Sequence, residues 1–346
     1  MPFLRVRRNS FGVNFPSLDG VRGIAILFVL LSHLSNEGYR IFNFSGKGVY
    51  GVYLFFVLSA FLLSYPFFNG CDINNRCEWK YFFLRRLARI YPLYIAVLLL
   101  DWLLVAIWNL TFNNNVYITN SLYEFVKHFF LMDLKGIFWA IDVEFKFYII
   151  LPVVIYIYVK FLKRNVYVLT CTTVAYHYFY QFFLYNYLGN IKLFFYLPLF
   201  LSGILISDIY AKVKQENNTL RRAIICEIIA MIFFIISFFI PGGIYHGYIL
   251  MFAVLWSAVI LCHLIGSGIL LRILSFPLLR FLGVISFSLY LIHYYFIELA
   301  KYFKVIIPEV AFLTIMLVTF MVSIVTYQII ERPFIVLARK QIGHLK

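Results

Sequence analysis

The first apolar stretch of the sequence carries an arginine and a histidine that stand eleven residues apart. In an α-helix, eleven residues rise roughly 16 Å and turn about three times, so Arg22 and His33 share nearly the same face. A guanidinium group binds anions, and an imidazole exchanges a proton near neutral pH. The pair predicts a ligand with its anionic end beside Arg22 and its reactive end beside His33. In the alternative interpretation, Arg22 reaches lipid headgroups and His33 makes one hydrogen bond to a neighbouring helix.

A second polar cluster lies on a helix predicted over residues 138–152. Residues four apart share a helix face, so Glu144 lies beside Tyr148, whereas Asp142 and Lys146 form an ion pair on another face. This leaves Glu144 without a local cation, and its carboxylate can orient the imidazole on the first helix and raise its proton affinity. The alternative is a buried acid that is protonated or paired for packing.

A basic cluster follows a cytoplasmic loop. Arg85, Arg86 and Arg89 are predicted at the start of a helix, where guanidinium groups and free backbone N–H groups favour phosphate. Ordinary anchoring of a loop by positive charge is the alternative.

Two further ionisable residues lie toward the C-terminus. His293 is a second buried imidazole, three residues after Tyr290, and Glu331 is predicted to pair with one of the loop arginines. The other imidazoles in apolar stretches have no companion pattern, and we interpret them as structural: they are His177, His246 and His263.

The composition indicates which kind of structural element positions these side chains. Of the 346 residues, 63% are hydrophobic and 13% are charged, whereas a soluble domain carries about a quarter charged residues. A membrane-spanning helix needs roughly 20 apolar residues. We therefore predict an all-α polytopic membrane protein, with about ten transmembrane helices in a single domain over residues 1–346. The expected spans are 18–36, 49–68, 88–108, 137–159, 165–186, 191–210, 223–241, 246–266, 279–300 and 307–330.

The net charge of +15 agrees with this order of spans. On one side of the membrane the loops hold 21 of the 30 Lys and Arg residues, and the other side holds seven. This ratio predicts that both termini are cytoplasmic, with Arg22 near the cytoplasmic surface and His33 near mid-membrane, and it makes nucleic acid an improbable partner. The five cysteines are scattered, which indicates reduced thiols and no metal site.

The residues in six places resemble the motifs of one family. The chain is similar to the acyltransferase-3 family of integral-membrane O-acyltransferases, whose hallmark is an arginine with a histidine eleven residues on. The motif order is kept from residue 18 to residue 333. The matching segments are Leu18-Asp-Gly-Val-Arg22 with His33, Phe55-Phe-Val-Leu-Ser59, Arg85-Arg-x-x-Arg89-Ile-x-Pro92, Trp139 with Glu144 and Phe147-Tyr148, Ile285-Ser-x-Ser-Leu-Tyr-Leu-x-His293, and Glu331-x-Pro333.

The resemblance implies an O-acetyltransferase that moves an acyl group, most often acetyl, from cytoplasmic acetyl-CoA to a carbohydrate hydroxyl. His33 would be the catalytic histidine and Glu144 its partner acid. The coenzyme is a donor substrate, and no cofactor or metal is expected to be bound permanently. The phosphates of the coenzyme would bind Arg22, Arg85, Arg86 and Arg89. Further motif positions that are candidate site residues are Asp19, Ser59, Tyr148, Ser286, Tyr290, His293 and Glu331.

Several positions depart from the family pattern. Ala60, Phe287 and Ala140 stand where Gly, Tyr and Ser are usual. Asp142 and Lys146 replace Ser and Gln, and their predicted ion pair makes the two changes mutually compensating.

The acceptor is open at this stage. The same donor chemistry suits several acceptors: a lipopolysaccharide O-antigen, an exopolysaccharide, peptidoglycan, a lipid-linked glycan or a small metabolite. The transfer can be direct or can pass through an acyl-enzyme. Some relatives carry a fused extracytoplasmic esterase-like domain; here we expect the membrane domain or a separate glycan-assembly protein to meet the acceptor. The expected location is the inner or plasma membrane of a bacterium.

Two other classes of function compete with this interpretation. A proton-coupled transporter also has many spans with buried His, Glu and Arg, but the sequence shows no internal repeat, and its basic cluster favours a phosphate-bearing ligand. A noncatalytic membrane scaffold is the third interpretation.

Overall fold

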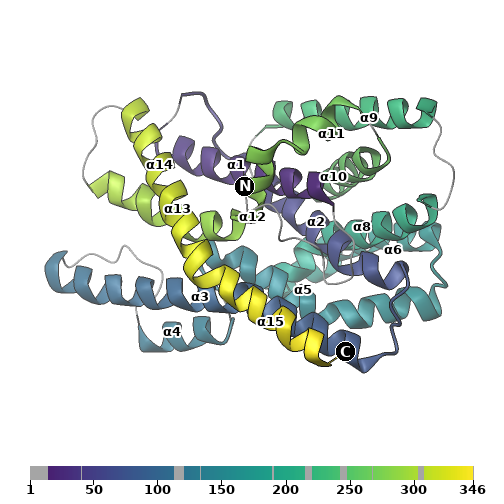
Figure 1. Cartoon of the computed structure of the whole chain (residues 1–346), viewed down its shortest axis with the longest axis horizontal. Helices are drawn as coiled ribbons and strands as arrows, with labels where there is room; N and C mark the ends of the chain where they lie inside the picture. The colour runs from purple at the N-terminus through teal and green to yellow at the C-terminus, as the bar shows by residue number, and fades with distance from the viewer. Residues whose placement is uncertain are drawn as a thin grey trace. The chain divides into compact units, whose positions relative to one another are not determined.

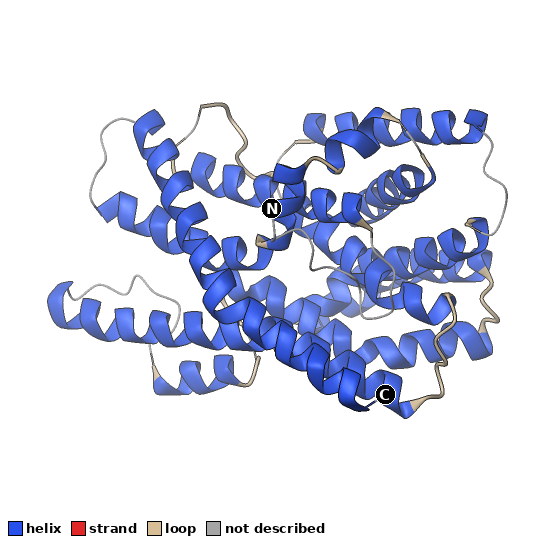
Figure 2. Ribbon diagram, in the orientation of Figure 1, coloured by secondary structure: helices blue, strands red, loops and turns tan. Residues whose placement is uncertain are grey.

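The structure is a computed structural model that describes residues 15–39, 41–112, 121–132, 134–188, 191–214, 220–241, 248–266, 268–302 and 308–345. Every regular element in these ranges is helical, which confirms the predicted all-α class (Figure 2). The helices divide into two compact units. The first unit holds residues 1–75 and 150–286, and the second holds residues 76–149 and 287–346.

The first unit is built around the N-terminal helix (Figure 1). Helix α1 packs on α2 and α12, α2 packs on α8, and α10 packs on α8 and α9. The helices of this unit are α1 (Pro16–Asn36), α2 (Gly48–Phe68), α6 (Val166–Phe179), α7 (Tyr185–Leu188), α8 (Lys192–Val213), α9 (Leu220–Phe239), α10 (Tyr248–Ile265), α11 (Ile269–Leu274) and α12 (Pro277–Val284), with π-helical turns η3 (Ile157–Phe161) and η4 (Tyr180–Leu184).

Glycine brings α1 and α12 into backbone contact. A Cβ atom added to Gly283 would collide with the backbone carbonyl of Asp19, and one added to Gly23 would collide with the carbonyl of Leu279. Small residues at helix crossings are the usual means by which membrane helices approach closely. The contact holds α1 in a fixed position and buries Asp19.

The second unit contains the longest helix of the described chain. Its elements are α3 (Arg76–Phe112), α4 (Leu122–Phe129), the 3-10 turn η2 (Gly136–Phe138), α5 (Trp139–Tyr156) up to residue 149, α13 (Ser286–Tyr302) from residue 287, α14 (Pro308–Thr326), the π-helical turn η5 (Tyr327–Glu331) and α15 (Arg332–Leu345). Helix α15 packs back along α3, and η5 also contacts α3.

Seven of the described helices are long and apolar enough to cross a membrane, and the pair Pro277–Val284 with Ser286–Lys301 makes an eighth if it is one span. The seven are Pro16–Asn36, Gly48–Phe68, Arg76–Leu104, Lys192–Val213, Arg221–Phe239, Tyr248–Ile265 and Pro308–Ile342. The two other expected spans, 137–159 and 165–186, are helical over most of their length but less apolar. Charged residues interrupt the first, and Tyr, His and Gln lower the hydropathy of the second.

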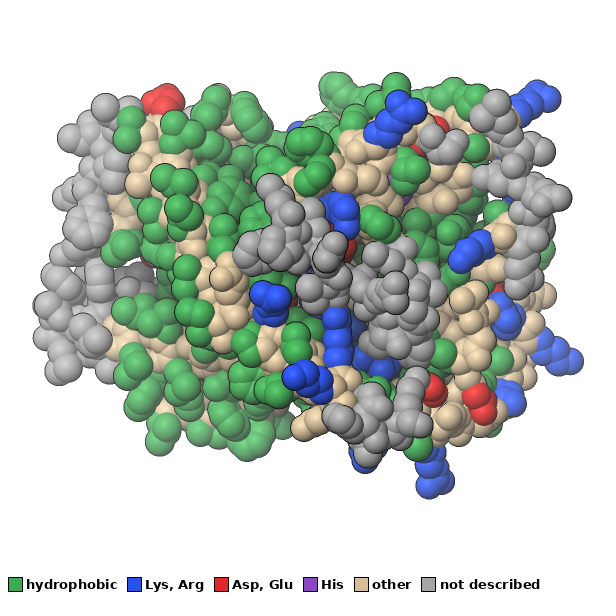
Figure 3. All heavy atoms as spheres, in the orientation of Figure 1, with side chains coloured by type: hydrophobic (Ala, Val, Ile, Leu, Met, Phe, Trp, Pro, Cys, Tyr) green, Lys and Arg blue, Asp and Glu red, His purple; other side chains and the backbone are tan. Residues whose placement is uncertain are grey.

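Large apolar side chains are exposed along helices of both units. On α9 they recur every four residues, at Ile224, Ile228 and Ile232, and α14 exposes Leu313 and Leu317 in the same way. Figure 3 shows hydrophobic side chains, in green, over much of the visible face of the protein. A soluble monomer rarely exposes continuous apolar faces of this kind, so these helix faces are suited to contact with lipid.

Candidate active site

The first unit carries the predicted arginine and histidine on one helix. Helix α1 runs unbroken from Pro16 to Asn36, with a proline at its first position, where the missing N–H has no helical partner to lose. Arg22 and His33 therefore lie roughly 16 Å apart on nearly one face. Both side chains are half-buried. His33 lies in the last turn of α1. Its expected depth near mid-membrane stays a prediction.

Arg22 is held in place by two other motif positions. Its Nη2 atom donates to Oγ of Ser286 at 3.5 Å, and its Cζ atom lies 5.9 Å from the ring centroid of Phe55 on α2. The Ser286 hydroxyl donates to the carbonyl of Gly283 at 2.9 Å, at the C-terminal end of α12. Ser59 follows Phe55 by one turn of α2 and is half-buried. An aromatic face and a hydroxyl, both uncharged, thus position the guanidinium group.

The three arginines of the second unit lie inside a helix. Helix α3 begins at Arg76, so Arg85, Arg86 and Arg89 are well past its first turn. The prediction that free N–H groups of a helix start surround them was wrong, since these backbone groups are within the helix. The apolar run of the span begins near residue 88, but the charged residues before it are good helix formers and extend the helix about three turns upstream.

Arg86 and Glu144 are linked by one tyrosine. The Cζ atom of Arg86 lies 6.0 Å from the ring centroid of Tyr148, and the Tyr148 hydroxyl donates to Oε1 of Glu144 one turn earlier on α5. Phe82 packs edge-on against the same ring. The prediction that Glu144 and Tyr148 share a helix face is confirmed. The contact between Tyr148 and Arg86 was not predicted from the sequence.

Arg89 pairs with the acid near the C-terminus. Its Nη2 atom lies 3.9 Å from Oε1 of Glu331, and Oε2 of Glu331 accepts a hydrogen bond from Ser288 at 3.0 Å. The predicted pairing of Glu331 with one of the arginines is therefore confirmed. Arg85, the third arginine, is buried.

Asp142 and Lys146, two positions that depart from the family pattern, form the predicted ion pair. Lys146 Nζ lies 2.7 Å from Oδ2 of Asp142, four residues earlier on α5. The Asp142 side chain is buried, while Lys146 is half-buried.

The second predicted imidazole is held by its own helix. Nδ1 of His293 lies 3.1 Å from the carbonyl oxygen of Leu289, and the His293 ring is buried. Tyr290 donates from its hydroxyl to the carbonyl of Ile137 at 2.6 Å, so it ties α13 to the turn before α5. Both contacts are structural ones, with the backbone as partner.

The structure thus brings the candidates together as three groups: Arg22 with Ser286, Arg86 with Tyr148 and Glu144, and Arg89 with Glu331. His33 belongs to the first unit and Glu144 to the second, so the expected carboxylate–imidazole contact stays a prediction. Sequence reasoning missed Ser288 as a partner of Glu331. The only signal for it was its place in the Ser-x-Ser motif, two residues after the serine that holds Arg22.

Metal chemistry has no candidate site in the described ranges, where no group of three or more His, Cys, Asp and Glu side chains is placed to hold an ion. None of the five cysteines forms a disulfide.

Comparison with protein families gives one match over most of the chain. The family model described as an acyltransferase domain, that of the acyltransferase-3 family, matches residues 15–328. The chain belongs to the acyltransferase-3 family. The matched range of this acyltransferase domain begins one residue before α1 and contains every candidate site residue except Glu331, which lies three residues beyond it.

Curated relatives of this acyltransferase-3 chain are found in Staphylococcus aureus. The O-acetyltransferase OatA of strain NCTC 8325 and that of strain COL are each 25% identical to it, over 92% of this chain and 57% of their own length. Another strain COL protein, provisionally named as an O-acetyltransferase, has the same identity and coverage. The chain thus spans little more than half the length of these relatives. No solved structure matches it.

Proposed function

We propose that this acyltransferase-3 chain is a membrane O-acetyltransferase that moves an acetyl group from acetyl-CoA to a hydroxyl of a cell-surface or lipid-linked carbohydrate. The observation that carries this proposal is the unbroken helix α1, which holds Arg22 and His33 on one face inside the family-matched range. The names of the relatives support O-acetyl transfer as the reaction class.

His33 is proposed as the general base. It accepts the proton of the acceptor hydroxyl while the hydroxyl oxygen attacks the thioester carbonyl carbon. The carbon–sulfur bond then breaks, and the coenzyme leaves as a thiolate that takes the proton from the imidazolium. An imidazole at the end of α1 suits this role, because it can reach an acceptor near the membrane surface. A transient acyl-enzyme is the variant of this scheme in which a side chain takes the acyl group first.

The arginines are proposed to bind the coenzyme phosphates. Arg22 is positioned by the ring of Phe55 and the hydroxyl of Ser286, and a guanidinium group fixed in this way suits the planar recognition of a phosphate. In the second unit, Arg86 stacks on Tyr148 and has no ion pair with a described residue. The positive charge of Arg89, in contrast, is paired with the carboxylate of Glu331. This contrast favours Arg86 over Arg89 as a phosphate ligand.

The test uses the full-length protein in lipid nanodiscs with acetyl-CoA. We expect slow release of free coenzyme thiol without an acceptor, faster release with an acetyl acceptor, and loss of both in His33→Ala. The matched control is His177→Ala, a histidine of the same unit to which no role in transfer is assigned. If wild-type protein releases no thiol in nanodiscs and, in proteoliposomes, couples substrate uptake to protons, the transporter interpretation is right and this proposal is wrong.

A cell-based measurement identifies the acceptor class. Wild-type protein expressed in a null strain should restore O-acetyl groups on one class of surface glycan, and His33→Ala at equal membrane abundance should not. Full restoration by His33→Ala would show that the proposed mechanism is wrong.

A further inference from the structure

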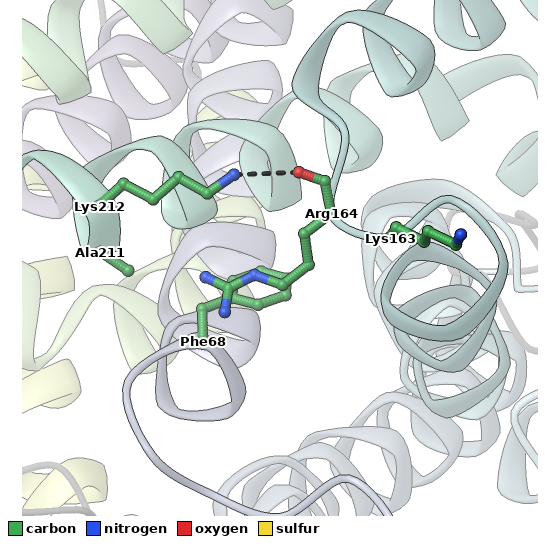
Figure 4. Close-up of a pocket in the computed structure, with 5 residues that line it drawn as sticks. All are labelled: Phe68, Lys163, Arg164, Ala211 and Lys212. Carbon is green, nitrogen blue, oxygen red and sulfur yellow. Dashed lines mark hydrogen bonds between the residues drawn. The ribbon is translucent and has the colours of Figure 1, made fainter.

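A basic cavity lies in the first unit, at the C-terminal ends of α2 and α8 and beside the turn that precedes α6. Its volume is about 330 Å³, at the lower end of the range for small-ligand sites. Figure 4 shows its lining residues, which are Phe68, Lys163, Arg164, Ala211 and Lys212. None of them belongs to the groups assigned to acetyl transfer.

A buried carboxylate organises the cationic wall of the cavity. Asp208 is fully buried on α8; its Oδ1 atom accepts from Nε of Arg164 at 2.8 Å and also from Nη2. Its Oδ2 atom lies 2.8 Å from Nζ of Lys212 and accepts from the Tyr158 hydroxyl at 2.8 Å. One negative charge therefore fixes two cations, and the wall keeps a net positive charge.

The donors on these cations are only partly used. A guanidinium group has five N–H donors, and two nitrogens of Arg164 face Asp208, so the Nη1 donors have no hydrogen-bond partner among the described residues. Lys212 has three donors; one faces Asp208 and one binds the carbonyl oxygen of Arg164 at 3.0 Å, the dashed contact in Figure 4. Lys163 is exposed and extends away from Arg164 in that view, so it adds charge at the rim.

The backbone beneath the cavity is held in an uncommon shape. Lys163 and Arg164 have φ values of 48° and 55°, the left-handed region that residues with a side chain rarely adopt. Hydrogen bonds from Arg164 N to the carbonyl of Tyr158 at 3.0 Å and from Asn165 N to that of Leu162 at 2.9 Å close the turn. The Cζ atom of Arg164 lies 5.2 Å from the ring centroid of Phe68. Figure 4 shows the two side chains next to each other. The arginine is therefore pre-oriented before any ligand binds.

We propose that this cavity binds one phosphate group. A guanidinium fork with unused donors, beside a partly used ammonium group, matches the several acceptor oxygens and the charge of a phosphate. Two sources of this chemistry fit its place at the ends of two apolar helices: the headgroup of an anionic phospholipid, or a phosphate of a soluble nucleotide. The proposal is independent of the transfer reaction, because a phosphate site here needs none of the residues assigned to that reaction.

The test uses full-length protein in phosphatidylcholine nanodiscs with two probes. Adenosine 3′,5′-bisphosphate is titrated as the soluble probe and followed by thermophoresis, and phosphatidylglycerol is doped into the nanodisc and its retention is followed by native mass spectrometry. The coenzyme site proposed around Arg22 and Arg86 can take the same soluble probe, so the assignment depends on the cavity variant described below. Binding of the soluble probe that this variant weakens assigns the cavity to a nucleotide, and retention of the lipid alone, weakened by the same variant, assigns it to a headgroup. Wild-type protein that binds neither probe overturns the proposal.

The decisive variant is Arg164→Gln combined with Asp208→Asn. It removes one positive and one negative charge, so the net charge is unchanged while the guanidinium fork is lost. We expect binding of the assigned probe to weaken at least about tenfold. The control is Lys160→Gln, which removes an exposed cation of the neighbouring π-helical turn that does not line the cavity; it should stay within about twofold of wild type.

A milder variant covers the case in which the double variant does not fold. Lys163→Glu reverses a charge at the rim but leaves Arg164 and Asp208 paired. We expect it to weaken binding several-fold and to reduce the loss of binding on adding salt, because less attraction remains for salt to screen. Wild-type affinity in both the double variant and Lys163→Glu, or an equal loss in Lys160→Gln, would show that the cavity residues only hold the turn against α8.

Discussion

Arg89 and Glu331 meet in the interior of the second unit, 3.9 Å apart between Nη2 and Oε1. The Glu331 side chain is 0% exposed and that of Arg89 13%, so water screens their attraction very little. The hydroxyl of Ser288 donates a hydrogen bond to the other carboxylate oxygen of Glu331. One acid therefore joins α3, α13 and the π-helical turn η5, and it fixes the arginine that stands one turn after Arg85 and Arg86.

Removing the charge of Glu331 is expected to destabilise the protein strongly. Glu331→Gln keeps the side-chain volume but removes the acid beside the Arg89 guanidinium group, and breaking a buried pair by removing one partner costs about 3 kcal/mol or more. The measurement is the midpoint of thermal unfolding in detergent. Glu298→Gln is the control, because its pair with Lys301 at 2.8 Å is partly exposed and is worth about 1 kcal/mol or less. Equal shifts in the two variants would contradict this account.

Tyr148 has two separable contacts, and two substitutions distinguish them. Tyr148→Phe keeps the ring beside Arg86 and loses the hydrogen bond to Glu144, whereas Tyr148→Leu loses both. On the proposed function, we expect the phenylalanine variant to lower kcat about tenfold with little change in the KM for acetyl-CoA. The leucine variant should raise that KM as well, since Arg86 loses its aromatic support. A raised KM in Tyr148→Phe would show that the hydroxyl, and not the ring, positions the arginine.

The close crossing of α1 and α12 makes Gly283 intolerant of a side chain. Gly283→Ala places a methyl group against the backbone carbonyl of Asp19, which no side-chain rotation relieves. We expect loss of folded protein in detergent, measured by size-exclusion chromatography of a fluorescent fusion. Gly38→Ala is the comparison: Gly38 has φ +83°, and an added methyl group lies in open space among the described residues, so the cost is a backbone strain of about 1 kcal/mol. Similar yields of both variants would show that the crossing is looser than described.

The ion pair on α5 predicts a compensating double substitution. Asp142→Ser alone leaves the half-buried Lys146 without its acid and should destabilise the protein by about 2 kcal/mol, between the values of exposed and buried pairs. Adding Lys146→Gln, which gives the family's usual residues at both positions, should restore most of that loss. Thermal unfolding of the two single variants and the double variant gives the coupling energy, and simple additivity would mean that the pair contributes nothing.

The contacts that the sequence determined are those within one helix. Residues four apart share a helix face, which predicts the contacts of Glu144 with Tyr148 and of Asp142 with Lys146. A spacing of eleven residues likewise puts Arg22 and His33 on a common face. The all-α membrane fold follows from composition, because the 13% of charged residues cannot cover a water-facing surface. These are local properties, and they hold wherever the helices pack.

Only the tertiary structure decided which distant residue each charge meets. The sequence indicated that Glu331 pairs with an arginine, but the choice of Arg89 depends on how α3 packs against η5, and no local rule contains that information. The same holds for Asp208 and Arg164, which are 44 residues apart, and for the ring of Tyr148 beside Arg86. The start of α3 was misplaced for a related reason: hydropathy marks where a helix enters the membrane, whereas hydrogen bonding and helix propensity decide where the helix begins.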